Sequence, residues 1–240
     1  MKKNKKKKYK MTSISHNVEN LVFSGLSETE PRKLKTLIEV GAFDGKDSLA
    51  FHKRGYRVFT FEPKRDLYEN LVKKTKDIAN YTVTPKAVCL TNGKTTFNIC
   101  QQGGASSILP FRSKQELIKT WTKNRTDIHY SGQSYEVETI RLDTFVEENG
   151  LQNDIIDYIH IDAQGVDLDC LKSLGEYIKN VQEGVVETVI DPKKSIYQNQ
   201  DSNTYENVKI FLESNGFKID KVVSNDKTHC EHNVFFSKAS

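Results

Sequence analysis

The stretch from Leu37 to Ser48 constrains the fold more than any other part of this chain. A short apolar strand, Leu37 to Val40, leads into a turn that contains Gly41 and Gly45, and a helix is expected from Lys46 to Arg54. Because glycine has no Cβ, Gly41 lets the backbone turn sharply and come close to a ligand. Open α/β sheets bind nucleotide-like ligands where a strand passes through such a turn into a helix. The sequence therefore predicts an α/β fold with a ligand site at this turn.

The residues of the turn do not match either of two common phosphate-binding loops. A Walker loop has four residues between its glycines and a Ser or Thr after its Lys, whereas here three residues separate Gly41 from Gly45, and Asp47 follows Lys46. A dinucleotide fingerprint has three glycines, and this turn has two. Three carboxylates surround it: Glu39, Asp44 and Asp47. Carboxylates repel a pyrophosphate but suit a cationic ligand with free hydroxyls, such as S-adenosylmethionine. An ordinary strand-to-helix turn with a glycine cap is the alternative.

A second strand strengthens the case for a ligand with a ribose. Arg57 to Phe61 is expected to form this strand, and Glu62 and Pro63 follow it. Glu62 lies 62 − 41 = 21 residues after Gly41. An acidic residue about 20 positions beyond the glycine turn is placed to bind a ribose diol. Pro63 then suits the start of the next helix.

Length and composition indicate one globular domain. A chain of 240 residues suits a single α/β domain; we expect residues 31–240 to form it, after a lysine-rich tail and lead-in over residues 1–30. No apolar run reaches the ~20 residues of a membrane span, and no secretory signal is seen. The four cysteines form no CxxC pair, which favours a reducing compartment and predicts a cytoplasmic protein: Cys89, Cys100, Cys170 and Cys230.

The net charge of +4 comes from the N-terminus. Residues 1–10 hold seven lysines and no acids, so the rest of the chain has 36 − 7 = 29 basic and 32 acidic residues, a net charge of −3. The lysine run is expected to be a solvated arm, with binding to nucleic acid or to an anionic surface as the alternative. A domain that reads nucleic acid is expected to be basic, so the acidic body argues against nucleic acid as a partner.

A second stretch with candidate functional residues runs from Ile155 to Gly165. Its apolar residues predict a central strand, on which Tyr158, His160 and Asp162 share one face. Asp162 falls where the strand should end. In a parallel sheet it would then lie beside the first glycine turn, where ligands bind.

Periodicity and turn signals predict the remaining elements. Asn92-Gly93 predicts a hairpin that extends the sheet edge by an antiparallel strand, and Ser113 with Glu116 predicts a capping box. Within the helix over 64–78, Leu67, Leu71, Val72 and Ile78 should face inward. Further helices are expected over 113–123, 143–149, 167–178 and 204–214, and strands over 81–90, 95–100, 135–142, 181–190, 217–223 and 233–236. The strand over 81–90 has room for a bend at Pro85.

Three loops carry polar residues of interest. The Ser106-Ser107 pair lies in a loop over 101–110, which either approaches a ligand or is a flexible surface loop. The loop over 124–134 is long enough to be functional and contains His129. The run His229-Cys230-Glu231-His232 resembles a metal cluster, but four adjacent residues cannot all point at one tetrahedral ion, so no zinc site is predicted.

Several of these segments together resemble the FkbM family of S-adenosylmethionine-dependent methyltransferases. The resemblance covers roughly residues 35–237, and two positions depart from the common pattern: Gln164, where Glu is frequent, and His160, where Lys is frequent. It implies a class I, Rossmann-like α/β fold, with a seven-stranded mostly parallel sheet, an antiparallel last strand and helices on both faces. It also implies methylation of a hydroxyl, often on a sugar. The matching segments are Leu37–Ser48, Phe61-Glu62-Pro63, Ala105-Ser106-Ser107, residues 137–143, Ile161–Gly165 with Asp167, Glu187, Tyr197 and residues 211–217.

The predicted function is therefore O-methylation of a sugar or glycan hydroxyl with S-adenosylmethionine as the methyl donor. A nucleic-acid (RNA) methyltransferase and a binding-only relative without turnover are the alternatives. An alcohol needs a nearby base, for which Asp162 is the first candidate, and His160, Glu187 and His129 are the others. Magnesium held by Asp162 and Glu187 is an open possibility. The residues expected to bind the cofactor are Glu39, Gly41, Asp44 and Glu62, with Ser107 and Asp162 at its methionine end.

Overall fold

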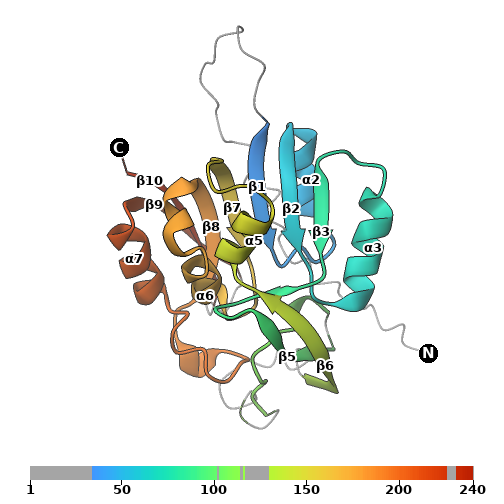
Figure 1. Cartoon of the computed structure of the whole chain (residues 1–240). Helices are drawn as coiled ribbons and strands as arrows, with labels where there is room; N and C mark the ends of the chain where they lie inside the picture. The colour runs from blue at the N-terminus through green and yellow to red at the C-terminus, as the bar shows by residue number, and fades with distance from the viewer. Residues whose placement is uncertain (1–33, 102, 114–115, 117–129, 226–230, 240) are drawn as a thin grey trace, which may run out of the picture.

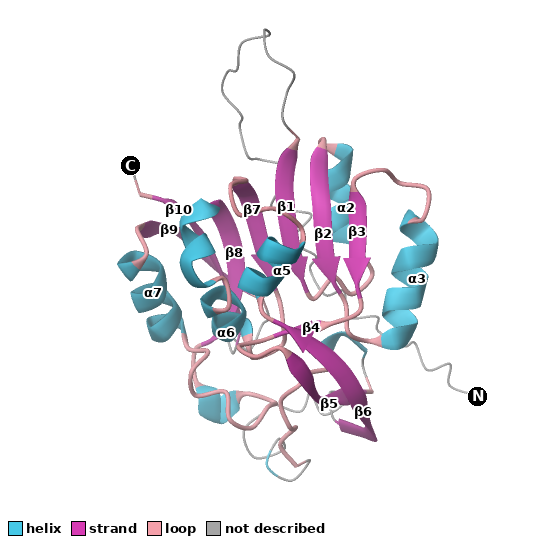
Figure 2. Ribbon diagram, viewed as in Figure 1, coloured by secondary structure: helices cyan, strands magenta, loops and turns pink. Residues whose placement is uncertain are grey.

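A computed structural model describes residues 34–101, 103–113, 116, 130–225 and 231–239. A seven-stranded sheet forms its centre (Figures 1 and 2). The strands of this sheet are β1 (Lys35–Val40), β2 (Tyr56–Phe61), β3 (Tyr81–Thr84), β7 (Ile156–Ile161), β8 (Val181–Val189), β9 (Phe217–Ser224) and β10 (Glu231–Lys238).

The strand order is β3-β2-β1-β7-β8-β10-β9. Neighbouring strands from β3 to β8 pair in parallel, whereas β10 is antiparallel to both β8 and β9. The chain order reverses at the boundary between β1 and β7, which is where open α/β sheets bind their ligands. This arrangement confirms the predicted Rossmann-like, mostly parallel sheet with an antiparallel last strand.

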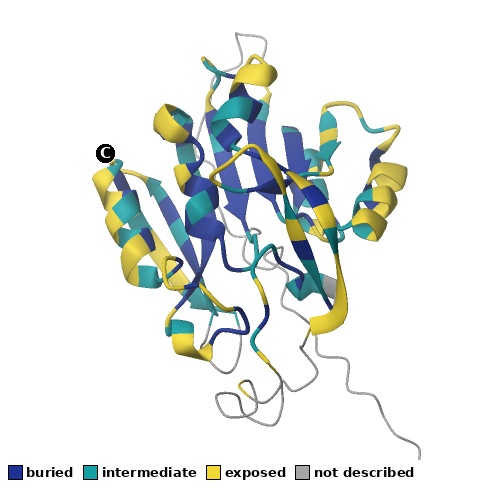
Figure 3. Cartoon of the chain, turned by 60° about the horizontal axis from the view of Figure 1, so that its bottom comes forward, coloured by how far each residue is buried: buried dark blue, intermediate teal, exposed yellow. Residues whose placement is uncertain are grey.

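Helices cover both faces of the sheet. On one face, Phe51 of α2 (Lys46–Lys53) packs on Tyr56 and Tyr158, with ring centroids 5.1 and 4.8 Å apart. On the other face, Phe145 of α5 (Leu142–Glu148) packs edge-on against Phe59 and Phe61. The same core includes apolar residues of α6 (Asp167–Lys172) and α7 (Tyr205–Ser214), while α3 (Arg65–Thr75) flanks β3. Figure 3 shows the central strands buried between helices whose outer surfaces are exposed.

A second, three-stranded sheet lies next to the carboxyl ends of β1, β2 and β3 (Figure 1). It consists of β4 (Ala87–Val88), β5 (Gly93–Cys100) and β6 (Tyr130–Ile140), in the order β4-β6-β5. Val88 and Ile140 of this sheet belong to the main hydrophobic core, so the two sheets share one interior. The small sheet thus forms a wall beside the predicted ligand site.

The strand predicted over 81–90 forms as two strands, β3 and β4, on either side of Pro85, and the hairpin predicted after it was wrong. The main-sheet strand ends at Thr84, because Pro85 has no N–H with which to continue the ladder. The short β4 pairs in parallel with β6, and β5 pairs antiparallel with β6. Strand β6 lies between β4 and β5, so Asn92-Gly93 joins no hairpin; the Asn92 side chain accepts from the backbone N–H of Arg141 and donates to Thr144.

Two helix predictions also needed correction. The helix expected over 167–178 stops at Lys172, and Gly175, with φ +54°, begins a separate 3₁₀ segment. The helix expected over 64–78 ends at Thr75, and Val72 is 37 % exposed rather than inward. The inward residues predicted for 167–178 are buried all the same: Leu168, Leu171, Leu174 and Ile178.

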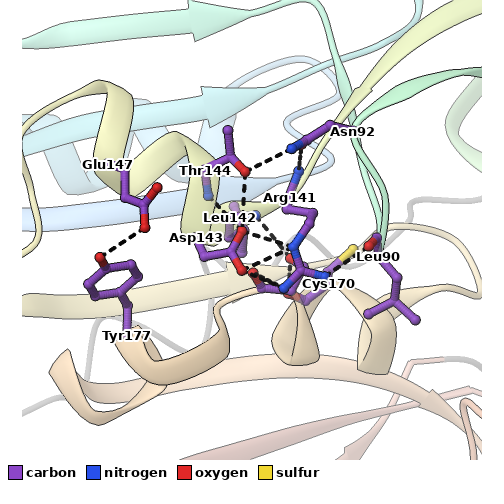
Figure 4. A network of polar contacts seen from close by, with 10 residues as sticks. Leu90, Asn92, Arg141, Leu142, Asp143, Thr144, Glu147, Cys170 and Tyr177 are labelled. Carbon is purple, nitrogen blue, oxygen red and sulfur yellow. Dashed lines mark hydrogen bonds and ion pairs between the residues drawn. The ribbon is translucent and has the colours of Figure 1, made fainter.

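An arginine network attaches the small sheet to the helical layer (Figure 4). The Arg141 guanidinium donates through Nε to both carboxylate oxygens of Asp143, at 2.9 and 3.0 Å, and through Nη1 to the carbonyl of Leu90 at 2.8 Å. The hydrogen bond from Arg141 holds the pKa of Asp143 below its usual range. The backbone N–H of Leu142 donates to the Ser173 hydroxyl just after α6. These contacts join the end of β6 to α5 and α6.

Several predictions concern the ends and loops of the chain. Ser113 and Glu116 form the reciprocal hydrogen bonds of the predicted capping box. Among the helices of the described part, none is long and apolar enough to cross a membrane. The N-terminal tail and lead-in, His129, His229 and Cys230 lie outside the described residues.

Candidate active site

The glycine turn joins the carboxyl ends of three strands. The Gly41 N–H donates to the carbonyl of Phe61 at 3.0 Å, and the Asp162 N–H donates to the carbonyl of Val40 at 3.0 Å. Gly41 has φ +83°, and a Cβ at this position would lie 1.9 Å from the carbonyl oxygen of Asp162. Only glycine fits here, because both the conformation and the contact exclude a side chain. The turn therefore holds the ends of β1, β2 and β7 together.

Glu62 is held at the end of β2 by two backbone donors. Its Oε2 accepts from the N–H of Phe43 and its Oε1 from the N–H of Lys64, each at 2.8 Å. The residue is 5 % exposed, and burial raises the pKa of Glu62 to about 7, although both hydrogen bonds act in the opposite direction. A carboxylate has about four acceptor positions. Glu62 therefore keeps the capacity to accept from a ligand's hydroxyl groups.

A cavity opens beside this turn. Gly41, Glu62 and Asp162 line it, together with Gln164 and Ser106. Its walls come from the main sheet, the small sheet and the loop after β5, and they are largely apolar: Phe61, Leu67, Val88, Phe97, Ile108 and Val166. An apolar pocket with a few polar groups at defined positions is typical of a small-molecule site.

Three carboxylates meet at the ends of β7 and β8. One oxygen of Asp162, one of Asp167 and one of Glu187 all lie within 4.8 Å of one another. Asp167 is fully buried and accepts from the N–H of Gly165 at 3.0 Å and from the Asn203 amide at 2.9 Å. Asp167 thus shapes the loop after β7, whereas Asp162 lines the cavity.

Gln164 links these carboxylates to the neighbouring loops. Its Nε2 donates to Asp162 at 2.5 Å and lies 3.4 Å from Glu187, and its Oε1 accepts from the Tyr197 hydroxyl at 2.7 Å. The second oxygen of Glu187 accepts from the amide of Asn225, which follows β9. The network therefore extends from the cavity to the antiparallel strands.

Crowding raises the pKa values of all three carboxyls. Burial raises the pKa of Asp162, and burial together with the charge of Asp162 raises that of Asp167 to about 7. The same two causes raise the pKa of Glu187 well above its usual range. Like charges this close cannot all ionise easily, so the cluster retains a proton at pH values where an isolated carboxyl would have lost it. Once ionised, such a group is a stronger base than an exposed carboxylate.

Two of the predicted site residues lie on the opposite face of the sheet. Glu39 and His160 lie two residues after Leu37 and Tyr158 on the same strands, so they share the face that packs beneath α2. Glu39 is 1 % exposed, accepts from the Thr60 hydroxyl at 3.0 Å and lies 3.4 Å from Nδ1 of His160. Burial lowers the pKa of His160, but its hydrogen bond to Glu39 and the charge of Glu39 outweigh this effect, so the net shift is upward. Neither residue lines the cavity.

Asp44 and Ser107 also lie outside the cavity lining. The Asp44 carboxylate pairs with Lys46 on the rim of the turn. The Ser107 hydroxyl donates to the carbonyl of Gln164 at 2.7 Å and accepts from the N–H of Leu109 at 3.0 Å, so it braces one loop against the other. Its neighbour Ser106 lines the cavity. The sequence analysis identified this loop and named Ser107, whereas Ser106 is the serine that lines the cavity, and it did not identify Asn225, which no motif marks.

The sequence of this chain matches a known protein family. The family model for the methyltransferase FkbM domain matches residues 39–219. The chain belongs to the FkbM methyltransferase family. The match includes the glycine turn, Glu62 and the carboxylate cluster, and it confirms the predicted family. No match is found among curated protein sequences.

Three solved structures similar to this FkbM domain are distant in sequence. A ribosomal protein L11 methylase from Lactobacillus delbrueckii subsp. bulgaricus is 12 % identical, with a TM-score of 0.44, over 87 % of this chain and 72 % of that chain. An rRNA methylase from Streptococcus thermophilus is 12 % identical, with a TM-score of 0.46, over 86 % and 88 %. A magnesium protoporphyrin IX methyltransferase from Synechocystis PCC 6803, with bound SAM, is 9 % identical, with a TM-score of 0.45, over 86 % and 70 %.

Proposed function

We propose that this protein is an S-adenosylmethionine-dependent O-methyltransferase that acts on a hydroxyl group of a sugar or glycan. The observation that carries the proposal is the carboxylate cluster of Asp162, Asp167 and Glu187 at the edge of the donor cavity. The FkbM domain supports the methyl-transfer chemistry. The three free cysteines of the described part, Cys89, Cys100 and Cys170, support a cytoplasmic location.

The cavity fits the chemistry of the proposed donor. Glu62 would accept hydrogen bonds from the ribose hydroxyls, and the apolar walls suit the adenine ring. The Asp162 carboxylate would lie near the cationic part of the donor. The donor could approach the backbone at Gly41, because glycine has no Cβ. We assign Glu39 and Asp44 a supporting role through their negative charge, and Ser107 a role in holding the loop. When bound, S-adenosylmethionine supplies an electrophilic methyl group.

The protein's own contribution is to orient the acceptor hydroxyl and take its proton. An alcohol is a weak nucleophile at neutral pH, so a base within hydrogen-bond reach contributes about 10²–10⁴-fold. Asp162 and Glu187 are the proposed proton acceptors, because their environment makes them stronger bases than exposed carboxylates. His160 lies beneath α2, outside the cavity lining, so we propose no proton transfer by it.

Two features support a hydroxyl-rich acceptor. We call the side of the cavity at Asp162 the acceptor end. Its network combines carboxylates with the amides of Gln164 and Asn225, and both groups are suitable hydrogen-bond partners for hydroxyl groups. Without residues 1–10 the net charge is 29 − 32 = −3, which disfavours nucleic acid as the acceptor. The oxygens of Asp162 and Glu187 are also the ligand type that magnesium prefers. A comparison of turnover with and without EDTA tests whether methyl transfer requires magnesium.

A methyl-transfer assay tests the proposal. The protein is incubated with labelled S-adenosylmethionine and either a panel of mono- and oligosaccharides or an RNA pool, and the products are identified by mass spectrometry. We expect O-methylated sugar from the wild type and about 10²–10⁴-fold slower formation from Glu187→Gln. Methylated RNA without sugar methylation would favour the alternative substrate class. Donor binding with no transfer to either panel would identify a binding-only relative.

A further inference from the structure

A second polar cluster lies behind the glycine turn, on the opposite face of the sheet from the donor cavity. It consists of Glu39 on β1, Asp47 on α2 and His160 on β7, and one possible ligand atom from each lies within 4.8 Å of the others. Glu39 and His160 are direct partners in the ladder between β1 and β7. Asp47 comes from the first turn of α2, which covers this face. The cluster therefore joins three separate elements.

The imidazole of His160 is only partly satisfied. The residue is 5 % exposed, and its Nε2 has no hydrogen-bond partner. Buried nitrogens of this kind are nearly always bonded, so an unpartnered one needs an explanation. Nε2 is at the end of the ring away from the backbone, on the side where α2 packs. The second nitrogen, Nδ1, lies 3.4 Å from Oε1 of Glu39, longer than the about 2.7–2.9 Å of a good charge-assisted bond.

Among the described residues, the negative charge of Glu39 also lacks a close basic partner. Glu39 is 1 % exposed, and within the described part of the chain His160 is the only basic side chain that lies within 4 Å of it. A buried carboxylate is stable only when it is paired or when it binds a metal. Glu39 accepts one hydrogen bond from the neutral Thr60 hydroxyl at 3.0 Å, and its contact with the imidazole is long, so the charge of this buried carboxylate is only partly compensated.

We propose that Glu39, Asp47 and His160 bind one divalent transition-metal ion, such as Zn²⁺. Histidine nitrogen and carboxylate oxygen are both zinc ligands, and water can supply the fourth position of a tetrahedral site. The role of the ion is structural: it ties α2 to β1 and β7 directly behind the donor turn. The site differs from the carboxylate cluster in the cavity, which contains oxygen ligands alone and suits magnesium.

The test is metal binding by the full chain after chelation. Protein stripped with EDTA is titrated with Zn²⁺ by calorimetry, and in parallel with Co²⁺, whose visible absorption reports tetrahedral coordination. We expect one ion per chain and at least tenfold weaker binding by His160→Gln. His52→Gln is the matched control, since its ring bonds the Ala79 carbonyl outside the cluster, and it should bind as the wild type does. The double variant Asp162→Asn/Glu187→Gln should also retain the site.

The wild-type measurements keep the test decisive even where a variant does not fold. A Co²⁺ spectrum of tetrahedral type and a rise in melting temperature on adding Zn²⁺ would support the site without any substitution. No binding by the stripped wild type would overturn the proposal. Loss of binding in the double variant, with His160→Gln unchanged, would assign the ion to the cavity cluster instead. Methyl transfer is measured by its own assay, so failure of this metal site leaves the proposed function standing.

Discussion

The Gly41 position offers a sharp test of how the donor turn is built. In Gly41→Ala the new Cβ would lie 1.9 Å from the Asp162 carbonyl oxygen, whereas real Cβ atoms do not come closer than 3.0 Å. The ends of β1 and β7 must therefore separate by about 3.0 − 1.9 = 1.1 Å, or the turn must move. Backbone shifts of this kind cost about 1–3 kcal/mol. Placing alanine at φ +83° costs about 1–2 kcal/mol more. We expect a loss of about 2–5 kcal/mol in the free energy of unfolding.

Gly55 provides a matched control for this substitution. It has φ +87°, but a Cβ there would meet nothing within 4 Å. Gly55→Ala therefore carries only the conformational cost of about 1–2 kcal/mol. Urea unfolding of the wild type and both variants measures the difference, and calorimetry measures donor affinity. Gly41→Ala should lose donor binding while Gly55→Ala keeps it. Equal destabilisation and equal affinity in the two variants would refute the close approach of Gly41 to Asp162.

Three further predictions concern the carboxylates and their neighbours. Glu187→Gln should lower kcat by about 10²–10⁴-fold with donor affinity unchanged. The wild-type kcat/KM should rise with pH as the carboxyl cluster, whose pKa values are raised, ionises. A flat kcat/KM profile from about pH 5 to 9 would contradict a carboxylate base. Burial raises the pKa of Glu62 from 4.5 to about 7, so the folded state holds this proton more tightly than the unfolded state. The resulting stabilisation amounts to about 3 kcal/mol, is complete below pH 4.5 and disappears as pH rises through about 7. The free energy of unfolding of Glu62→Ala, measured in urea, should lack that part of the pH dependence. Tyr197→Phe should cost about 1–3 kcal/mol of stability by leaving Gln164 Oε1 without its donor, and unchanged urea midpoints would refute that contact.

The central sheet was predictable because its strands are local, apolar and followed by clear turn signals. Leu37 to Val40 and Arg57 to Phe61 form strands as expected, and Glu62 and Asp162 line the same cavity. Both residues lie at strand ends, and parallel strands bring those ends together regardless of their distance along the chain.

The errors arose where pairing depends on distant segments. The Asn92-Gly93 signal describes a local hairpin, but β5 pairs with β6 and the Asn92 side chain bonds Arg141 and Thr144 instead. Alternation placed His160 and Asp162 on one face, but strand β7 ends at Ile161, so Asp162 turns to the cavity while His160 stays beneath α2. Asn225 reaches Glu187 only because β9 and β10 pair antiparallel, a contact that no local pattern encodes.

Calorimetric titration with S-adenosylmethionine tests the central claim most directly. We predict one binding site per chain, and binding weaker by about 1–3 kcal/mol in Glu62→Ala because charge-assisted contacts to the ribose are lost. Glu69→Ala, an exposed glutamate on α3, is the control and should bind as the wild type does. No heat with the wild type, or equal affinity in Glu62→Ala, would contradict the assignment of this cavity to the methyl donor.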